Sequence, residues 1–243
     1  MFCLKWLLSA VMILCISSAS LIAQQPAFLV VETFRTTDCP PCDAVETELT
    51  QIRQQNDVKN LPTYVLVFHA DPTESGNGFT KPEFTNRLNA YAQMLQAQQV
   101  VYPLIVANGE HNIPAEMDNK LLEKARRDAS KLAPAASITL EARKTGFQDI
   151  IVQYNITPDL RGNLLQVALV QKQGKSPDEA GESNYIQIVR DFKSLRFRGE
   201  VTTGNVSVKI PNGVEAANLQ IIAFSQNQIS GQIVAAAVTD IDG

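Results

Sequence analysis

The sequence lacks the features that identify several common classes of protein. Its 243 residues carry a formal charge of −4 and a pI near 5.3. The lysines and arginines are scattered, so nucleic-acid binding has no electrostatic support. Glycine-rich phosphate-binding loops and zinc-protease helices are absent. What is present is the composition of a folded protein, 45% hydrophobic and 19% charged, long enough for one large domain or two ordinary ones.

Long apolar runs are also missing after the N-terminus, so the mature chain is expected to have no transmembrane span. The N-terminus itself has Lys5, an apolar stretch from Trp6 to Ile16, and small residues up to Ala23. This pattern predicts a secretory signal peptide over residues 1–23. A membrane anchor is the alternative, but the apolar stretch is short and serines interrupt it.

Cysteine is scarce, with four in the chain. Removal of residues 1–23 takes away Cys3 and Cys15, which leaves Cys39 and Cys42 as a single pair. A secreted chain meets compartments that permit disulfides, so we expect the periplasm or the outer-membrane periphery as its location.

The cysteine pair lies between a predicted strand and a predicted helix. Phe28–Phe34 is rich in β-branched and aromatic residues, which indicates a buried strand. The helix that follows carries Val45, Leu49 and Ile52 on one face, and Glu46 is expected on the solvent side. Cys39 would then lie at a helix N-terminus, where the helix dipole lowers the pKa of a thiol.

A second apolar strand, Leu61–Phe68, completes a strand–helix–strand unit with its two strands parallel. His69 and Asp71 follow it directly and are expected near the cysteines. A helix is predicted from Pro82 to about Gln98, and a strand from Tyr102 to Ala107 ends at a hairpin signal, Asn108-Gly109. Pro103 would begin that strand and face the cysteines.

The remainder of the first half predicts a short return strand near Ile113 and an amphipathic helix over Ala115–Leu132. After Pro134 helical periodicity ends, and short strands alternate with turn residues, which favours an antiparallel β-sandwich. The predicted strands are Ser137–Ala142, Asp149–Ile156, Leu164–Gln171, Tyr185–Phe192, Leu195–Arg198, Val206–Ile210, Leu219–Ser225 and Gln232–Thr239. The expected domains are therefore 24–133 and 134–243.

This order of elements, with C-x-x-C opening a helix and a proline opening a later strand, resembles the thioredoxin superfamily. The chain is more specifically similar to a bacterial family of secreted thioredoxin-fold proteins of unknown function. The motifs that carry this likeness are Val31-Glu32-Thr33-Phe34, Phe68-His69-Ala70-Asp71 and Tyr102-Pro103 through Asn108-Gly109. The β-rich half also resembles that of outer-membrane-associated thioredoxin-like proteins.

The resemblance implies an α/β thioredoxin-like domain followed by an all-β antiparallel sandwich, and it suggests roles for single residues. Pro103 would be the cis-proline that packs against the redox pair, and Glu32 would be a buried acid that exchanges protons with Cys42. Pro72-Thr73 stands where the family has an aromatic pair, which changes the expected shape of a substrate pocket. Arg190 is a recurring position of the β-rich half, for which the sequence predicts only an ion pair.

Each of these residues has a simpler alternative role. Cys39 and Cys42 could form a permanent disulfide, although a three-residue separation closes too small a loop to stabilise the fold much. Glu32 could be an edge-exposed or a capping glutamate, and His69 could be a structural hydrogen-bonding residue rather than a base. Pro40 and Pro41 remove N–H donors from the first helical turn, which weakens its stabilisation of a Cys39 thiolate.

The sequence thus predicts a secreted thioredoxin-like thiol–disulfide oxidoreductase that acts on thiols or disulfides of envelope or secreted proteins, with Cys39 as nucleophile and Cys42 as resolving thiol. No cofactor or bound metal is expected. The alternative is a non-enzymatic binding or assembly module in which the β-rich half holds a partner. A third hypothesis, delivery of a metal by the paired thiols, would require the reduced cysteines as ligands.

Overall fold

The strand that leads to the cysteine pair is central in a sheet of the first half of the chain. The structure is a computed structural model that describes residues 26–37, 39–58, 61–71, 73, 78–114, 119–158, 160–175, 184–197 and 202–242. The predicted signal peptide, and the first residues of the predicted helix over Ala115–Leu132, lie outside these residues. No helix in this part of the chain is both long and apolar enough to cross a bilayer.

Strands and helices alternate in the first half as the sequence predicts. The elements are β1 (Leu29–Arg35), α1 (Pro40–Val58), β2 (Thr63–His69), α2 (Pro82–Met94), β3 (Leu104–Ala107), β4 (His111–Ile113) and α3 (Asn119–Ala129). β1 pairs in parallel with β2 and antiparallel with β3, and β3 pairs antiparallel with β4. The hairpin at Asn108-Gly109 and the parallel pair around α1 are therefore confirmed.

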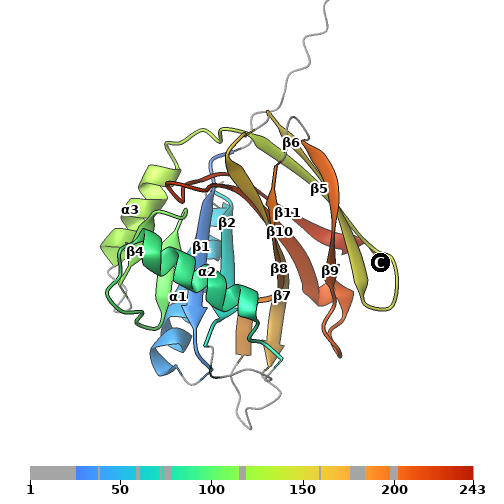
Figure 1. The fold of residues 1–243 in the computed structure, drawn as a ribbon. Helices are drawn as coiled ribbons and strands as arrows, with labels where there is room; N and C mark the ends of the chain where they lie inside the picture. Colours follow the sequence, from blue (N-terminus) through green and yellow to red (C-terminus); the bar gives the residue numbers. More distant parts are fainter. Residues whose placement is uncertain are drawn as a thin grey trace, which may run out of the picture.

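The two faces of β1 pack against different helices because successive side chains of a strand point to opposite faces. Leu29 and Val31 lie in a cluster with side chains of α1 and α3. Val30 and Phe34 lie in another cluster, with side chains of α2. The β1 strand is thus buried on both faces, with α1 and α3 on one side and α2 on the other (Figure 1).

The second half is almost entirely β. Its elements are β5 (Ser137–Lys144), β6 (Asp149–Thr157), β7 (Asn163–Lys175), β8 (Asn184–Arg196), β9 (Thr203–Lys209), the 3-10 turn η1 (Ala216–Asn218), β10 (Leu219–Asn227) and β11 (Ile233–Asp242). Each predicted strand overlaps one of these elements, although Ile210 and Gln232 lie one residue outside β9 and β11, and Arg198 lies outside the described residues. The two strands predicted over 185–192 and 195–198 overlap a single strand, β8.

The strands of the two halves join in one mixed sheet of eight, in the order β4-β3-β1-β2-β8-β7-β10-β11. β8 runs parallel to β2, with Val67 opposite Ile188, and the end of β11 runs parallel to β5, so the second half is not the purely antiparallel sandwich that the sequence predicts. The physical reason is the edge of β2, an apolar strand whose unpaired backbone groups need a neighbour. The predicted division at residue 133 stays a prediction, although the sheet crosses it.

The remaining three strands, β5, β6 and β9, form a separate antiparallel sheet. It touches the large sheet at its edge, where the end of β11 pairs with β5. An apolar cluster fills the space between this small sheet and strands β7, β10 and β11. In Figure 1 the helices lie at one end of the molecule and β5 and β9 lie at the other.

The β3–β4 hairpin packs closely on the turn between β10 and β11. Gly109 and Gly231 both have positive φ, +78° and +81°. A Cβ added to Gly109 would lie 1.9 Å from the carbonyl oxygen of Gly231. The N–H of Ile233 donates to the carbonyl of Asn108 at 3.0 Å, so only glycine allows the two turns to approach this far.

Candidate functional site

The cysteine pair lies where the sequence predicts it, at the start of α1. Cys39 and Cys42 form a disulfide with a Cα–Cα distance of 5.3 Å. The N–H of Cys42 donates to the carbonyl of Cys39 at 2.9 Å, which makes the first turn of the helix. Cys39 is 5% exposed and Cys42 is 0% exposed, so an incoming thiol would meet Cys39 first.

Two prolines separate the cysteines and lie on the solvent side of this turn. Pro40 and Pro41 are both exposed and belong to α1. A proline is tolerated in the first helical turn because its missing N–H would have no partner within the helix. The turn between the cysteines is consequently stiff, and its backbone offers fewer N–H donors than a helix N-terminus without prolines.

A buried ion-pair cluster lies one turn further along α1. Arg35, the last residue of β1, donates to Glu46 at 2.7 Å and to Asp43 at 3.0 Å. Glu46 is 4% exposed, so its predicted solvent-facing position is wrong. Burial raises the pKa of Glu46 to about 7, although Arg35 acts in the opposite direction. Glu46 follows Cys42 by four residues and shares its buried helix face.

Glu32 is buried, but the structure does not bring it to the cysteines. It shares the β1 face of Val30 and Phe34, opposite the face that carries α1. Its carboxylate accepts hydrogen bonds from Arg87 at 2.5 and 2.7 Å and from the hydroxyl of Tyr91. Gln226 of β10 contacts both Arg87 and Tyr91, so Glu32 belongs to a network that joins the two halves of the chain.

Pro103 lies at the sheet edge nearest the cysteines. The Tyr102–Pro103 peptide bond is cis, as the resemblance implies, and Pro103 is buried. Phe34 pairs with Leu104, so Pro103 is level with Arg35 in the next register position. Arg35 in turn pairs with His69 across β1 and β2. The strand ends therefore bring Pro103 and His69 to one edge, as predicted, together with Arg35, which the sequence does not predict there.

His69 is buried among aromatic rings. Its ring centroid is 5.1 Å from that of Phe79 and 5.1 Å from that of Tyr185. Neither ring nitrogen has a hydrogen-bond partner within the part of the chain that the structure describes. Burial, reinforced by Arg35 and Arg190, lowers the pKa of His69 to about 3, so the imidazole is neutral at physiological pH.

Arg190 lies beside this histidine on β8. Its guanidinium carbon is 4.1 Å from the centroid of Phe79, and Nη2 donates to the carbonyl of Gly78 at 3.3 Å. Among the described residues no carboxylate forms an ion pair with it, which differs from the ion pair predicted. Arg35, Glu46 and Tyr185 could not be assigned to this site from the sequence, because their contacts join residues of different elements.

Residues that could hold a metal ion are not gathered here. In the described ranges no three or more His, Cys, Asp or Glu side chains lie close enough together to form a metal site. The expected proximity of His69 to the cysteines does not by itself supply a metal site, because a structural zinc site takes four protein ligands.

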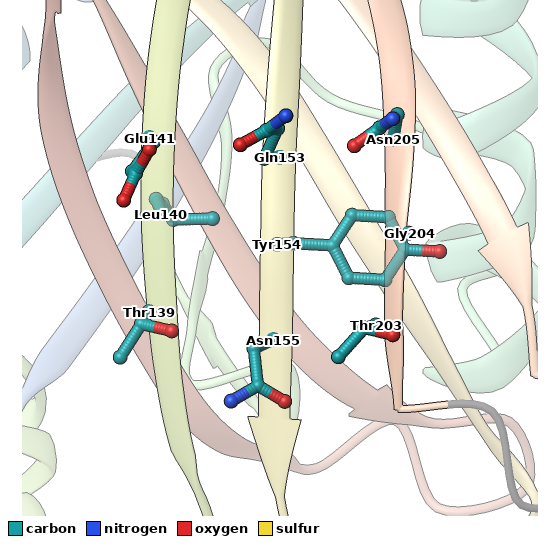
Figure 2. A pocket seen from close by; sticks show the side chains of 9 residues that line it. All are labelled: Thr139, Leu140, Glu141, Gln153, Tyr154, Asn155, Thr203, Gly204 and Asn205. Carbon is teal, nitrogen blue, oxygen red and sulfur yellow. The ribbon is translucent and has the colours of Figure 1, made fainter.

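A separate groove lies on the outer face of the small sheet, far along the chain from the cysteines (Figure 2). Its volume is about 490 Å³, and the polar side chains form two rows across β5, β6 and β9: Glu141, Gln153 and Asn205, then Thr139, Asn155 and Thr203. An antiparallel sheet with one solvated face needs such polar residues for solubility. None of them is a buried side chain lacking a partner among the described residues.

Comparisons with known proteins support the fold but add no activity. The model of a family described as "Protein of unknown function (DUF1223)" matches residues 30–226. A search of curated proteins found no match. The crystal structure of protein AGR_C_4864 from Agrobacterium tumefaciens is similar, with 18% identity and a TM-score of 0.59 over 89% of this chain and 95% of that one.

A second similar structure covers much less. β-Glucosidase 3B from Thermotoga neapolitana, solved with glycerol, has 20% identity and a TM-score of 0.25 over 46% of this chain and 16% of its own. This likeness is too low to support an inference about the present chain.

Proposed function

We propose that this chain, which belongs to the DUF1223 family of proteins of unknown function, is a thioredoxin-like thiol–disulfide oxidoreductase whose redox centre is the Cys39–Cys42 pair. The strand order β4-β3-β1-β2, with α1 and α3 on one face and α2 on the other, supports the thioredoxin-like assignment.

The observation that carries the proposal is the position of the disulfide in the first turn of α1. A thiolate there benefits from the positive end of the helix dipole, which makes it a better leaving group and a more abundant nucleophile. The carboxylate of Asp43 would oppose this effect, but Arg35 pairs with it at 3.0 Å. The unequal burial of the two cysteines favours Cys39 as the sulfur that a partner attacks.

The reaction would proceed through a mixed disulfide. A partner thiolate attacks Sγ of Cys39, the Cys39–Cys42 bond breaks, and Cys42 leaves as a thiolate. A second thiolate of the partner then attacks its own sulfur in the mixed disulfide, which releases Cys39 and leaves the partner oxidised by two electrons. The reverse sequence, begun by a Cys39 thiolate on a partner disulfide, reduces the partner.

The proposed partners are thiols or disulfides of envelope or secreted proteins, and the proposed location is the periplasm or the outer-membrane periphery. The support is the N-terminal sequence pattern of residues 1–23 and a cysteine pair close enough to form a disulfide. Pro103, at the same sheet edge, would shape the groove in which a partner chain docks.

A second candidate function is a binding or assembly module with a permanent disulfide. The observation in its favour is the low exposure of Cys39, 5%, because a catalytic nucleophile has to be reached by its partner. In that case the β-rich half would hold the partner.

The reduction potential of the pair distinguishes the two functions, measured by equilibration with glutathione or dithiothreitol and trapping of free thiols. An exchange enzyme is expected to have a potential of roughly −120 to −270 mV, whereas a structural bridge lies below about −300 mV. Cys42→Ser should trap a mixed disulfide on Cys39, and Cys39→Ser is the matched control that should not. A low potential with no trapped adduct would reject the redox function.

A further inference from the structure

Three nitrogen-bearing side chains lie in a row across β1, β2 and β8. Arg35 pairs with His69, and the ring of Phe79 lies between His69, 5.1 Å away, and the guanidinium of Arg190, 4.1 Å away. Paired residues of parallel strands project from the same face of the sheet. Two aromatic rings hold the row together, since Arg35 lies 4.5 Å from the ring of Tyr185 and Arg190 lies 4.1 Å from that of Phe79.

The two arginines of this row differ in how their charge is balanced. Arg35 has Asp43 and Glu46 as ion-pair partners. Arg190 is 9% exposed and has no ion pair within the described residues, and its Nε is buried without a hydrogen-bond acceptor. Burial lowers the pKa of Arg190 to about 10, which still leaves it charged at neutral pH. A buried cation without a counter-ion is costly, so a bound anion would stabilise this site.

His69 also has buried nitrogen atoms without hydrogen-bond partners. It is 1% exposed, and neither Nδ1 nor Nε2 has a partner in the described part of the chain. A neutral imidazole has one N–H donor and one acceptor, so the donor remains available to a ligand oxygen. Buried polar atoms without partners are rare in folded proteins and often indicate a ligand or ion.

We propose that Arg190 and His69 bind a carboxylate group, with Nε of Arg190 and the N–H of His69 as its donors. One uncompensated positive charge matches a monoanion, whereas a phosphate dianion would leave a negative charge in excess among the rings of Phe79 and Tyr185. The carboxylate belongs either to a polypeptide or to a free small acid, which present the same chemistry. The site does not depend on the redox reaction proposed above.

The chain has two histidines, so histidine-selective isotope labelling gives a direct test by NMR. Sodium acetate is titrated into the protein at constant ionic strength, with sodium chloride as the balancing salt. The ring signal of His69 should shift saturably with acetate and not with chloride, and His111 on β4 serves as the internal reference. No saturable shift of His69 with any carboxylate, or a tighter response to phosphate than to acetate, would overturn the assignment.

Variants locate the binding site. Arg190→Gln should weaken acetate binding by about tenfold or more, because a charge-assisted hydrogen bond is lost. Arg143→Gln, at an exposed arginine on β5, is the matched control and should bind as the unmodified protein does. If Arg190→Gln does not fold, the ranking of acetate, phosphate and chloride on the unmodified protein still decides the question. Equal acetate binding by a folded Arg190→Gln protein would refute the role of Arg190.

The source of the carboxylate is distinguished by a second set of ligands. A short peptide with a free C-terminal carboxylate is compared with its amidated form and with acetate. Tighter binding of the free-acid peptide than of acetate identifies a polypeptide terminus as the ligand, and equal binding identifies a small acid. Equal binding of the free and amidated peptides would contradict recognition of a carboxylate.

Discussion

Glu46 is a buried acidic residue of α1, and it lies four residues after Cys42. It carries a carboxyl group of pKa about 7 in a position 4% exposed, held by Arg35 at 2.7 Å. A carboxyl group this close to Cys42, one helical turn away, could influence the charge around the disulfide. Its protonation state should also be visible in the stability of the protein.

The stability contribution of Glu46 is expected to fall as the pH rises. The folded pKa, about 7, lies above the unfolded value of 4.5, so the folded state binds more protons between these two pH values. Stability from this group is complete below about pH 4.5 and is lost by about pH 7. The quantity to compare is the unfolding free energy of Glu46→Gln minus that of the unmodified protein. This difference should be larger at pH 8 than at pH 5, by about 1 to 3 kcal/mol.

Urea denaturation at pH 5, 6, 7 and 8 measures this difference. Glu48→Gln, the same substitution on the same helix at a partly exposed position, is the control. A Glu46→Gln difference that is constant across the pH range would show that Glu46 has an ordinary carboxyl group.

Glu46 is predicted on the solvent side of α1 but is buried, which shows a limit of prediction from helical periodicity. The spacing of Val45 and Leu49 correctly identifies the apolar face of α1. A glutamate beside that face is expected in solvent, because the sequence does not show that Arg35 from another element reaches it. Cys39, Cys42 and Pro103 could be located from local motifs, whereas the aromatic rings beside His69 and Arg190 could be found only in the tertiary structure.

At the scale of elements, the contact between two turns depends on glycine. Gly109→Ala should destabilise the protein by more than about 2 kcal/mol, since the new Cβ would meet the carbonyl of Gly231 and the backbone has positive φ. Gly213→Ala is the matched control, with φ +75° and nothing within 4 Å, and should cost only about 1 kcal/mol. Equal losses of unfolding free energy in urea for the two variants would show that the turns can separate without cost.

The network around Glu32 joins β1, α2 and β10. The buried charges of Glu32 and Arg87 stabilise each other. Arg87→Met should cost about 3 to 5 kcal/mol, because it leaves the Glu32 carboxylate buried without its cation. The double variant Glu32→Leu with Arg87→Met should be less destabilised than Arg87→Met alone, since apolar groups then replace both charges.

A double-mutant cycle by chemical denaturation tests this coupling. Removal of the exposed pair Glu141–Arg143, on β5, is the control and should change stability by less than about 1 kcal/mol. If the double variant loses as much as the sum of the single variants, the two charges are not coupled in the folded protein.

The positions of the strands were largely predictable from the sequence, but the pairing between strands of the two halves was not. Alternation and turn residues locate all the strands of the second half to within a few residues. The pairing of Val67 with Ile188 joins positions far apart in the sequence, and no local pattern specifies it. Sequence reasoning consequently treats the β-rich half as a unit with its own sheet, whereas β8 extends the sheet of the first half.

The whole molecule is organised around a core that both halves share. The cluster around Phe34 and Phe68 includes Phe192 and Phe224 of the second half, and the ring of Phe68 lies 5.5 Å from that of Phe192. The sheet continues from β2 to β8 at the same place. These contacts tie the stability of each half to the presence of the other.

The protein is therefore expected to unfold in one cooperative transition. In scanning calorimetry the calorimetric and van't Hoff enthalpies should agree, which is the test of two-state behaviour. A chain of residues 24–133 should fail to fold alone, because the edge of β2 and the side chains of Leu66 and Phe68 would meet water. The chain of residues 24–243 is the control, and both are compared by amide dispersion in NMR spectra. Two separate calorimetric transitions, together with a folded 24–133 fragment, would mean that the halves are independent domains and that the shared core contributes little to either.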